Sequence, residues 1–298
     1  MKFILEWNGV SYLYPYTRLP ALSDLSVVIP QGSRTAIIGH NGSGKSTMLL
    51  HAVGLVQPSE GSVELAGARL GYSRKQLAAL RQRIGLVLQD PEQQIIMNTP
   101  LADIAFGLRN LGLDEVEIGD RTRQVLELLR LQELAEVPVH HLSLGQKKRT
   151  ALAGILAVRP EVLLLDEPTS YLDPHSEQMM LQGLAEVHAA GTTVVMATHD
   201  MDLAYSWADW VIVLEKGTCR MQGRPEDVLA QQEMLEGAGL ALPLLIELWL
   251  GLPPELRRGR PAPRSKEHMK KLLRECLTAQ QESRLTIHDG DSSNGGDE

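Results

Sequence analysis

The segment GHNGSGKST, residues 39–47, has the residue types and the spacing of a loop that binds phosphate. It matches the pattern G-x-x-x-x-G-K-[ST] at Gly39, Gly44, Lys45 and Ser46. Glycines let backbone N–H groups turn toward the α and β phosphates of a nucleotide, and the N-terminus of a helix adds a partial positive charge. Lys45 would then reach the β and γ phosphates, and the Ser46 hydroxyl would coordinate Mg²⁺.

The flanks of this loop agree with that chemistry. The apolar run TAIIG precedes the loop and the helix-compatible run KSTMLLHAVGL follows it, which is the order of strand, loop and helix that a phosphate loop requires. A glycine-rich turn that fits the pattern by chance would need neither flank. The candidate nucleotide contacts of the loop are Gly39, Asn41, Gly42, Ser43, Gly44, Lys45, Ser46 and Thr47.

A pair of carboxylates supplies a second candidate centre. The run VLLLDE predicts a buried strand that carries Asp166 to its C-terminal edge, where parallel α/β sheets bind their ligands. Asp166 is therefore the predicted partner of the Mg²⁺ shell. Glu167 follows directly and is predicted to face the γ phosphate as the base, or the orienting group, for an attacking water. A pair of surface carboxylates without a function is the alternative.

The segment LSLGQ, residues 142–146, predicts the start of a helix. Ser143 fits the N-cap position, and Gln146, three residues later, completes a capping box. The N-terminus of such a helix attracts anions, so the segment is a second candidate phosphate contact, about 100 residues after Lys45.

Composition limits the class of protein. With 43% hydrophobic residues, 22% charged residues and a formal net charge of −8, the chain has an ordinary soluble profile that argues against general attraction to nucleic acid. The two cysteines, Cys219 and Cys276, have no paired spacing, so we expect no disulfide framework and no thiolate metal site. No apolar run approaches the roughly 18 residues that a membrane span needs. Any role at a membrane must therefore act through a partner.

The order of predicted elements indicates an α/β fold. Residues 1–30 predict a small β layer, and buried strands are predicted at TAIIG, IGLVL, EVLLLD and TTVVMAT with helical sequence between them. This alternation is typical of a mainly parallel sheet covered on both faces. Residues 99–158 predict a helical insert, and a hairpin is expected to turn at Lys216 and Gly217. From Pro253 onward the chain is basic and rich in proline.

These motifs in this order resemble the ATP-binding subunit of ABC transporters, over about residues 3–240. The resemblance implies a P-loop NTPase fold with a RecA-like parallel sheet, an N-terminal antiparallel β layer and ATP with Mg²⁺ as cofactors. Tyr14 matches the aromatic residue that stacks on adenine in that family, and Gln89 matches the glutamine that touches the metal and the attacking water. Asp173, in SYLD, matches the family's D-loop, and His199 matches the histidine that contacts the γ phosphate.

LSLGQ resembles the family's LSGGQ signature, which implies a head-to-tail dimer. In that family the signature of one subunit caps the nucleotide bound by the other, with two ATP molecules between the subunits. Ser143, Gly145 and Gln146 are the implied contacts. Leu144 replaces the common glycine and is left out, because a side chain there limits the approach of the backbone. The dimer would consist of identical chains or of two paralogous ATPases.

The signature, the segment QDPEQQI after Gln89 and the run DIAFGLRNLGL together resemble the ATPases of energy-coupling-factor importers, especially the cobalt or nickel type (CbiO-type). This resemblance implies a short helix after Gln89 that meets an integral membrane coupling protein, with Glu92, Gln93 and Gln94 exposed. It also implies a substrate-binding membrane subunit, no nucleic acid partner and a peripheral location on the cytoplasmic face of the cell membrane.

The expected domain division places the ATP-binding domain at 1–235, a C-terminal helical extension at 236–280 and a disordered acidic tail at 281–298. The apolar run at 238–252 is expected to form the core of the extension; an interfacial helix or a second dimer contact is the alternative. The basic run after it is either solvated or near anionic lipid headgroups.

Three other functions stay open. The chain could serve another ABC importer or an exporter, or it could be a soluble ABC ATPase that acts on ribosomes or DNA. It could also bind a metal itself, through His140 and His141 or through His268 with Cys276. Adjacent histidines do not easily face one ion, and a spacing of eight residues is poor for a helical site.

Overall fold

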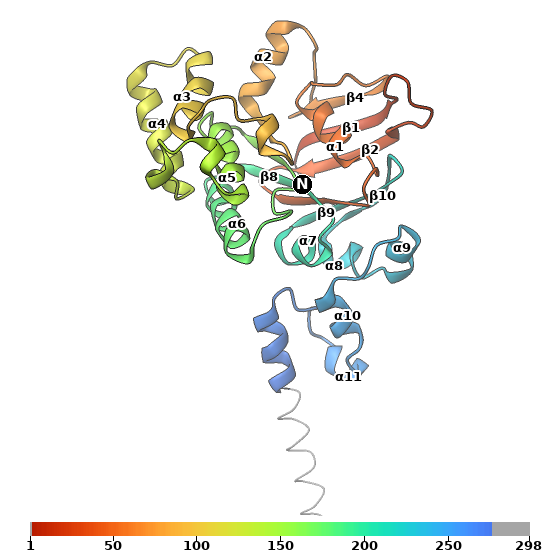
Figure 1. The fold of residues 1–298 in the computed structure, drawn as a ribbon. Helices are drawn as coiled ribbons and strands as arrows, with labels where there is room; N and C mark the ends of the chain where they lie inside the picture. Colours follow the sequence, from red (N-terminus) through yellow and green to blue (C-terminus); the bar gives the residue numbers. More distant parts are fainter. Residues whose placement is uncertain (1, 276–298) are drawn as a thin grey trace, which may run out of the picture.

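The computed structural model describes residues 2–275, which form two β-sheets surrounded by helices (Figure 1). The larger sheet has six strands in the order β10-β9-β3-β8-β7-β6. Its neighbouring strands are parallel, except that β9 and β10 form an antiparallel hairpin. The strands are β3 (Arg34–Ile38), β6 (Ile84–Val87), β7 (Val162–Asp166), β8 (Thr193–Thr198), β9 (Trp210–Glu215) and β10 (Thr218–Gly223). The four predicted buried strands and the parallel sheet are confirmed.

The smaller sheet is antiparallel, in the order β2-β1-β4-β5. Its strands are β1 (Phe3–Tyr12), β2 (Leu22–Pro30), β4 (Glu60–Leu65) and β5 (Ala68–Arg69). The expected N-terminal β layer is therefore confirmed, but the hairpin of β4 and β5 was not predicted. The structure of this hairpin is regular: Val63 and Leu65 are buried alternately with more exposed neighbours, and Ala66 and Gly67 both have positive φ at the turn.

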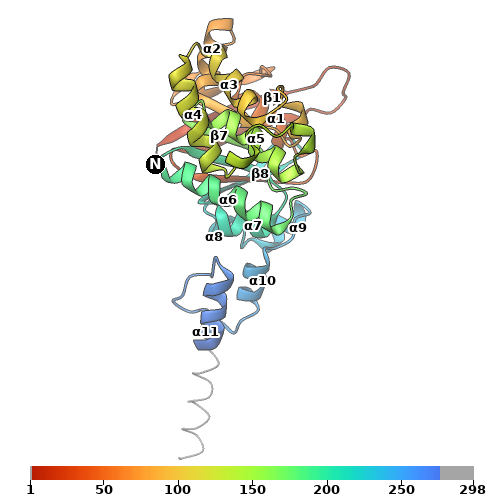
Figure 2. The ribbon, with the colours of Figure 1, turned by 60° about the vertical axis from the view of Figure 1, so that its left-hand side comes forward.

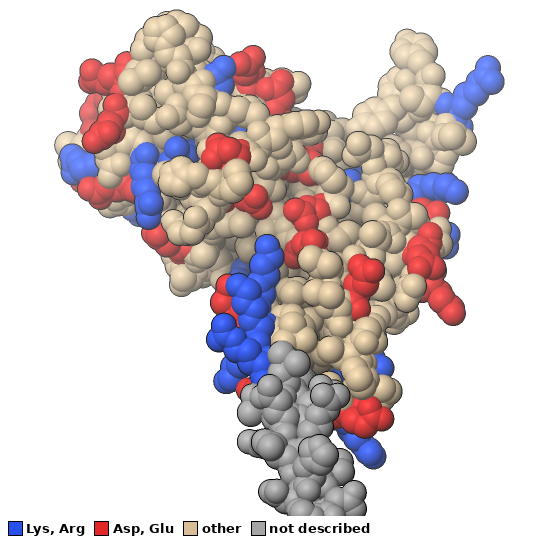
Figure 3. Space-filling view, turned by 60° about the horizontal axis from the view of Figure 1, so that its bottom comes forward, with Lys and Arg blue, Asp and Glu red and all other residues tan. Residues whose placement is uncertain are grey.

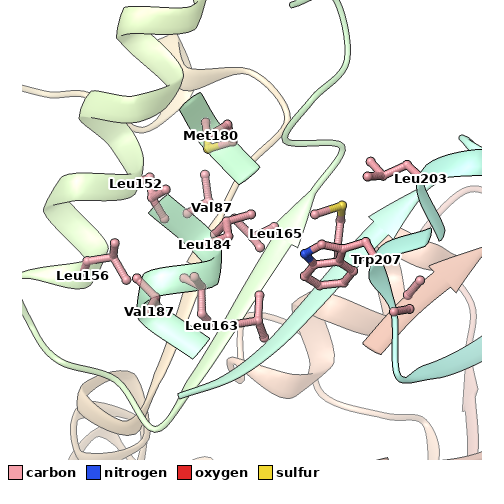
Figure 4. Close-up of a cluster of buried hydrophobic side chains, with 14 of the residues drawn as sticks. Val87, Leu152, Leu156, Leu163, Leu165, Met180, Leu184, Val187, Leu203 and Trp207 are labelled. Carbon is pink, nitrogen blue, oxygen red and sulfur yellow. The ribbon is translucent and has the colours of Figure 1, made fainter. Parts of the chain in front are cut away.

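The six-stranded sheet is buried on both faces, which explains the almost continuous apolar runs of its strands. Along β7, Leu163 and Leu165 belong to the cluster shared with α5 and α6, whereas Val162 and Leu164 belong to the cluster shared with the antiparallel sheet and α1. Figure 4 shows the first cluster, where Leu152, Leu156, Leu184 and Val187 of α5 and α6 meet β7. The sheet is thus fixed between two layers.

The insert between β6 and β7 is helical, as predicted. It contains α3 (Pro100–Asn110), α4 (Glu115–Leu128), η2 (Gln132–Leu134), η3 (Val139–His141) and α5 (Leu144–Leu156). The predicted capping box of α5 is confirmed, because Ser143 Oγ accepts from Gln146 N at 3.3 Å and Gln146 Oε1 accepts from Ser143 N at 2.8 Å. Thr99 and Asp114 cap the other two long helices.

The remaining helices surround the sheets or extend the chain beyond them. They are α1 (Lys45–Ala52), α2 (Arg74–Arg83), η1 (Pro91–Gln93), α6 (Pro174–Ala189), α7 (Met201–Trp207), α8 (Pro225–Val228), α9 (Gln232–Gly237), α10 (Leu244–Leu250), α11 (Pro254–Arg257) and the helical residues 266–275. The predicted hairpin turn is confirmed, with positive φ at Lys216 and Gly217. Across residues 2–275, no helix is both long and apolar enough to span a membrane.

The C-terminal helices project from the main body on the side of α7 and α8, as Figures 1 and 2 both show. The division at residue 235 stays a prediction, and the main core runs across it, since Leu240 and Ile246 are buried there. Trp249 forms a small cluster with Met269 and Leu272 instead. Figure 3 shows Lys and Arg side chains gathered on this extension, and the expected tail at 281–298 lies outside the described residues.

Arg264 attaches the extension to α7. Its guanidinium donates to Tyr205 O at 2.8 and 3.1 Å and also to Ala208 O, and it lies 5.7 Å from the centre of the Tyr205 ring. The last carbonyl groups of a helix lack partners within that helix. A cation placed there satisfies them and also interacts favourably with the helix dipole.

We expect Arg264→Met to release the extension while the rest of the fold remains. Hydrogen bonds from a charged donor contribute about 1.5–3 kcal/mol, so the free energy of local opening at residues 244–275 should fall by about that amount. Hydrogen exchange followed by mass spectrometry measures this. Arg260→Met is the control, because Arg260 makes a 3.5 Å ion pair with Glu275 on the surface of the extension. Equal exchange in both variants would contradict the role of Arg264.

Candidate nucleotide site

One cavity of about 400 Å³ brings most of the predicted site residues together. It lies where β3, β6, β7 and β8 end, because parallel strands deliver their carboxyl ends to one edge of the sheet. Residues from seven segments of the chain line it: Tyr14, Ala21, His40, Asn41, Gly42, Ser43, Gly44, Lys45, Ser46, Thr47, Gln89, Asp166, Glu167, Ser170, Tyr171 and His199. Gly39 contributes its carbonyl group, which accepts a hydrogen bond from Lys45.

The loop between β3 and α1 is folded around its own lysine. Lys45 Nζ donates to Gly39 O at 2.6 Å and to His40 O at 3.3 Å. Burial lowers the pKa of Lys45, and the charges of Glu167 and Asp166 oppose that shift. Glycine is required at Gly44, where φ is +105° and a Cβ atom would lie 2.7 Å from Ala21 O.

Two observations show that the loop suits phosphate. Ser43 Oγ is buried without a hydrogen-bond partner in the structure, so it has donor and acceptor capacity free for a ligand. The loop also ends at Lys45, the first residue of α1, where backbone N–H groups and the helix dipole favour an anion. The geometry therefore places a lysine, a free hydroxyl and a helix N-terminus around one cavity.

Asp166 and Ser46 fit a Mg²⁺ ion. Burial raises the pKa of Asp166, and the hydrogen bond with the Ser46 hydroxyl opposes that shift. Gln89 lines the same cavity and brings an amide oxygen. Mg²⁺ prefers oxygen ligands from one or two protein side chains together with substrate phosphates, and these three residues offer such a set.

Glu167 is the most constrained carboxylate of the site. Its side chain is 8% exposed, and His199 Nδ1 lies 3.0 Å from both of its oxygens. Ser170 Oγ donates to Glu167 Oε2 at 2.7 Å. The backbone of Glu167 has φ +48°, a left-handed conformation that is uncommon for a residue with a side chain. Such strain, when the surrounding structure maintains it, is typical of functional sites.

Tyr14 lies at the cavity beside α1. Its hydroxyl is 3.3 Å from Thr47 Oγ1, and its ring meets the Tyr12 ring edge-on at a centroid distance of 4.9 Å. The contact with Tyr12 fixes the orientation of the ring, which leaves an aromatic side chain beside the phosphate loop.

The signature residues do not line this cavity. Ser143, Gly145 and Gln146 are at the start of α5, and Leu144 between them is 39% exposed. Gly145 also has a packing role, since a Cβ atom there would lie 2.7 Å from Ser176 Oγ. Predicted phosphate contacts therefore occur at two separate places on one chain.

The segment after Gln89 contains the expected short helix, η1, with one correction. Glu92 and Gln93 are exposed as predicted, and Glu92 Oε1 pairs with Lys147 Nζ at 2.5 Å. The prediction that Gln94 is exposed was wrong. Its side-chain amide accepts from Leu88 N at 3.0 Å and donates to Leu86 O at 3.1 Å. The side chain therefore turns back and bonds to the backbone at the end of β6.

The structure gives no support to the alternative in which the chain itself binds a metal. Within residues 2–275, no group of three or more His, Cys, Asp or Glu side chains is arranged to hold an ion. The rings of His140 and His141 meet edge-on instead, at a centroid distance of 4.2 Å. His268 is described, but Cys276 lies outside the described residues.

Sequence reasoning missed two residues that contact Glu167. Ser170 was part of the motif SYLD, but its hydrogen bond to the carboxylate depends on the tight turn after β7. Lys148 Nζ donates to the carbonyl oxygens of Glu167 and Ser170, both at 2.9 Å. Lys148 lies among the buried residues of α5. Helical periodicity in the sequence could have indicated that this lysine faces the core.

Comparison with known proteins identifies the family. The family described as ABC transporter matches residues 22–170. A putative ABC transporter ATP-binding protein of Nostoc is 47% identical over 83% of this chain and 90% of its own length. The chain belongs to the ABC transporter family. The energy-coupling factor transporter ATP-binding protein EcfA of Carboxydothermus hydrogenoformans is 41% identical, over 87% of this chain and 97% of its own.

The cobalt import ATP-binding protein CbiO of Rhodobacter capsulatus is 42% identical over 94% of this ABC ATPase and 98% of its own length. Among solved structures, CbiO1 of Clostridium perfringens, described as part of the complex cbiONQ, has a TM-score of 0.72 at 37% identity. The matched region covers 83% of this chain and 99% of the CbiO1 chain. The dimeric ATP-binding cassette MJ0796, bound to ADP and Pi, has a TM-score of 0.69 at 28% identity. The match covers 74% of this chain and 99% of the MJ0796 chain.

These relatives confirm the predicted family and the P-loop NTPase fold. The chain is an ATPase that binds ATP, and its relatives are of the energy-coupling-factor and cobalt type. Nucleotide binding by this ABC ATPase gives a first test of the cavity.

We expect Lys45→Met to weaken ATP binding by about 10- to 100-fold, because a hydrogen bond from a charged donor contributes about 1.5–3 kcal/mol. Stability should fall only modestly, since Gly39 O and His40 O lose their charged donor while the cost of burying the ammonium is also removed. Calorimetry with ATP and thermal unfolding measure the two effects. Lys216→Met, at the exposed hairpin turn, is the control. Unchanged affinity in the Lys45 variant would contradict this assignment.

Proposed function

We propose that this ABC ATPase powers the import of a transition-metal ion, cobalt or nickel, through an energy-coupling-factor complex in the membrane. The observation that carries the proposal is the cavity in which the phosphate loop meets the paired side chains of Glu167 and His199. The named function of the Rhodobacter relative supports the choice of cargo.

The first step is binding of the nucleotide. Tyr14 would stack on the adenine, while the loop residues from Gly39 to Thr47 surround the phosphates. Lys45 would exchange its bonds to Gly39 O and His40 O for the β and γ phosphate oxygens. Ser46, Gln89 and Asp166 would hold Mg²⁺, which neutralises negative charge on the phosphates when it is bound.

The second step is hydrolysis, in which Glu167 acts on the attacking water. Its carboxylate would take a proton from the water, or orient the water, as the oxygen approaches the γ phosphorus. His199, 64% exposed at the cavity, would donate to the γ phosphate. The hydrogen bond from Ser170 keeps Glu167 Oε2 in place, and Oε1, which His199 Nδ1 approaches at 3.0 Å, would act on the water once His199 turns to the phosphate.

The third element is a second subunit. The start of α5 is a helix N-terminus with a capping box and exposed surface at Leu144, yet it lies outside the cavity of its own chain. Ser143, Gly145 and Gln146 of one subunit would therefore contact the γ phosphate held by the other, in a dimer of identical chains or of paralogues. The dimeric state of the MJ0796 cassette supports this arrangement. Hydrolysis removes the shared ligand, so the dimer reopens.

We expect Glu167→Gln to bind ATP normally, to hydrolyse it at least about 100-fold more slowly, and to accumulate as a dimer. General acid–base catalysis contributes about 100- to 10,000-fold, and the amide cannot accept the proton. Phosphate release and size-exclusion chromatography with light scattering measure the two effects. Glu186→Gln, an exposed position on α6, is the control. Normal turnover by a strictly monomeric Glu167 variant would refute both the base and the dimer.

The surface after Gln89 is the proposed contact with the membrane coupling protein. Asp103 Oδ1 accepts from Ile96 N at 2.8 Å and from Met97 N at 3.0 Å, which attaches this loop to the first turn of α3. Ile96 is 71% exposed, and Met97 and Leu101 beside it are also exposed. Grouped apolar side chains on a surface are typical of a protein contact. Such a contact would place the ATPase at the cytoplasmic face of the membrane.

We expect Ile96→Asp to reduce co-purification of membrane subunits with the tagged full-length chain, because it places a charge in an apolar contact. ATP affinity should not change, since Ile96 does not line the nucleotide cavity. Mass spectrometry of detergent extracts identifies the subunits, and uptake of radioactive cobalt and nickel by the same cells identifies the cargo. Val116→Asp is the matched control, because Val116 is an equally exposed apolar residue on α4.

Two outcomes would contradict the proposal. Membrane subunits that co-purify without any effect of the ATPase on cobalt or nickel uptake would favour another importer or an exporter. Recovery of ribosomes or DNA in place of membrane subunits, sensitive to salt, would favour a soluble ABC ATPase.

A further inference from the structure

Lys148 is a buried cation that the mechanism above does not use. It lies on α5 and is 2% exposed, and its ammonium donates to Glu167 O and to Ser170 O, each at 2.9 Å. Burial lowers the pKa of Lys148, and the nearby carboxylates, Glu167 first among them, oppose that shift. Burial of an ammonium group costs free energy unless its partners compensate, so the groups that Lys148 contacts indicate its role.

The first contact supports a strained backbone. Glu167 has φ +48°, and Pro168 follows it, although a residue before proline is disfavoured in helical conformations. Glu167 N donates to Ala197 O at 3.0 Å, which fixes one side of the residue to β8. Lys148 fixes the other side through the carbonyl oxygen of Glu167.

The second contact acts on the side chain of Glu167. Ser170 Oγ donates to Glu167 Oε2 at 2.7 Å, and the carbonyl group of the same serine accepts from Lys148. One ammonium therefore holds both the backbone of Glu167 and the residue that orients its carboxylate. Displacement of the ammonium would change both at once.

We propose that Lys148 is a positioning residue for ATP hydrolysis: it holds the turn from Glu167 to Ser170 so that the Glu167 carboxylate faces the nucleotide. This inference rests on the proposed role of Glu167. Because Ser143 is the N-cap of α5, the same helix would contact the partner's nucleotide at its start and position the carboxylate of its own subunit from its second turn. The helix would therefore connect the two nucleotide sites of a dimer.

A purely structural role is the competing explanation, and the adjacent residue gives a matched control for it. Arg149 is 5% exposed on the same helix, and its guanidinium donates to Leu129 O at 2.7 Å and to Arg130 O at 3.5 Å. It is a buried cation bound to two backbone carbonyl groups, as Lys148 is. Its partners, however, lie at the end of α4.

The test compares Lys148→Met, Lys148→Gln and Arg149→Met in the full-length chain, below the lowest Tm of the set. We expect Lys148→Met to lower kcat for ATP by about 10- to 100-fold, since small displacements of catalytic groups have effects of that size. The KM for ATP and the calorimetric affinity should stay within about twofold. Lys148→Gln keeps N–H donors without the charge, so its kcat should lie between those of the wild type and Lys148→Met. Arg149→Met should lower Tm and leave kcat within about twofold.

A double-variant cycle then asks whether Lys148 acts through Glu167. The pair Lys148→Met with Glu167→Gln should hydrolyse ATP no more slowly than Glu167→Gln alone, because a positioning residue has nothing left to position. Should the Met variant fail to fold, Lys148→Gln replaces it in the cycle.

The inference is overturned if the Lys148 variants keep wild-type kcat, if Arg149→Met lowers kcat equally, or if the two losses multiply in the double variant. Failure of the proposed function gives a different result. In that case Glu167→Gln itself keeps wild-type turnover, whatever the Lys148 variants do.

Discussion

The register of three neighbouring parallel strands determines where the chemistry of this protein can occur. β3, β8 and β7 are paired so that Ile38 lies opposite Thr198 and Asp166 lies opposite Ala197. Each strand therefore ends at the same edge and delivers its next residues there: the phosphate loop, His199 and Glu167. Since side chains alternate along a strand, a slip of one residue would turn the apolar sets of these strands toward the wrong layers.

Burial on both faces enforces that register. Leu163 and Leu165 must meet the helices, and Val162 and Leu164 must meet the antiparallel sheet, so β7 has one position that satisfies both clusters. The same burial shapes the electrostatics at the edge. Desolvation raises the pKa of Asp166 and lowers the pKa of Lys45, while their mutual attraction opposes both shifts. The opposite charges of Lys45 and Asp166 are thus kept close together in a partly desolvated cavity that a charged ligand can enter.

Local patterns in the sequence predicted most of this arrangement. The apolar runs predicted the parallel strands, the glycine spacing predicted the loop around Lys45, and the Ser143 and Gln146 pair predicted a helix start that the structure contains. The failures have a common cause. Gln94 was expected to be exposed, and the role of Lys148 was overlooked, because periodicity can indicate that a position is buried but not which backbone groups its side chain bonds to.

α5 contains both a feature that the sequence predicts and a contact that only the packing of the fold determines. A helix start is visible in sequence, but the direction in which its later turns point depends on packing, here against the turn after β7. Lys148 is five residues after Ser143, so it lies about 7.5 Å along the helix axis from the N-cap. At that spacing one rigid element can present an N-terminus outward to a phosphate and an ammonium inward to the Glu167 turn. Movement of α5 that follows a ligand at its start would therefore reach the turn that holds Glu167 directly, because no flexible segment lies between them.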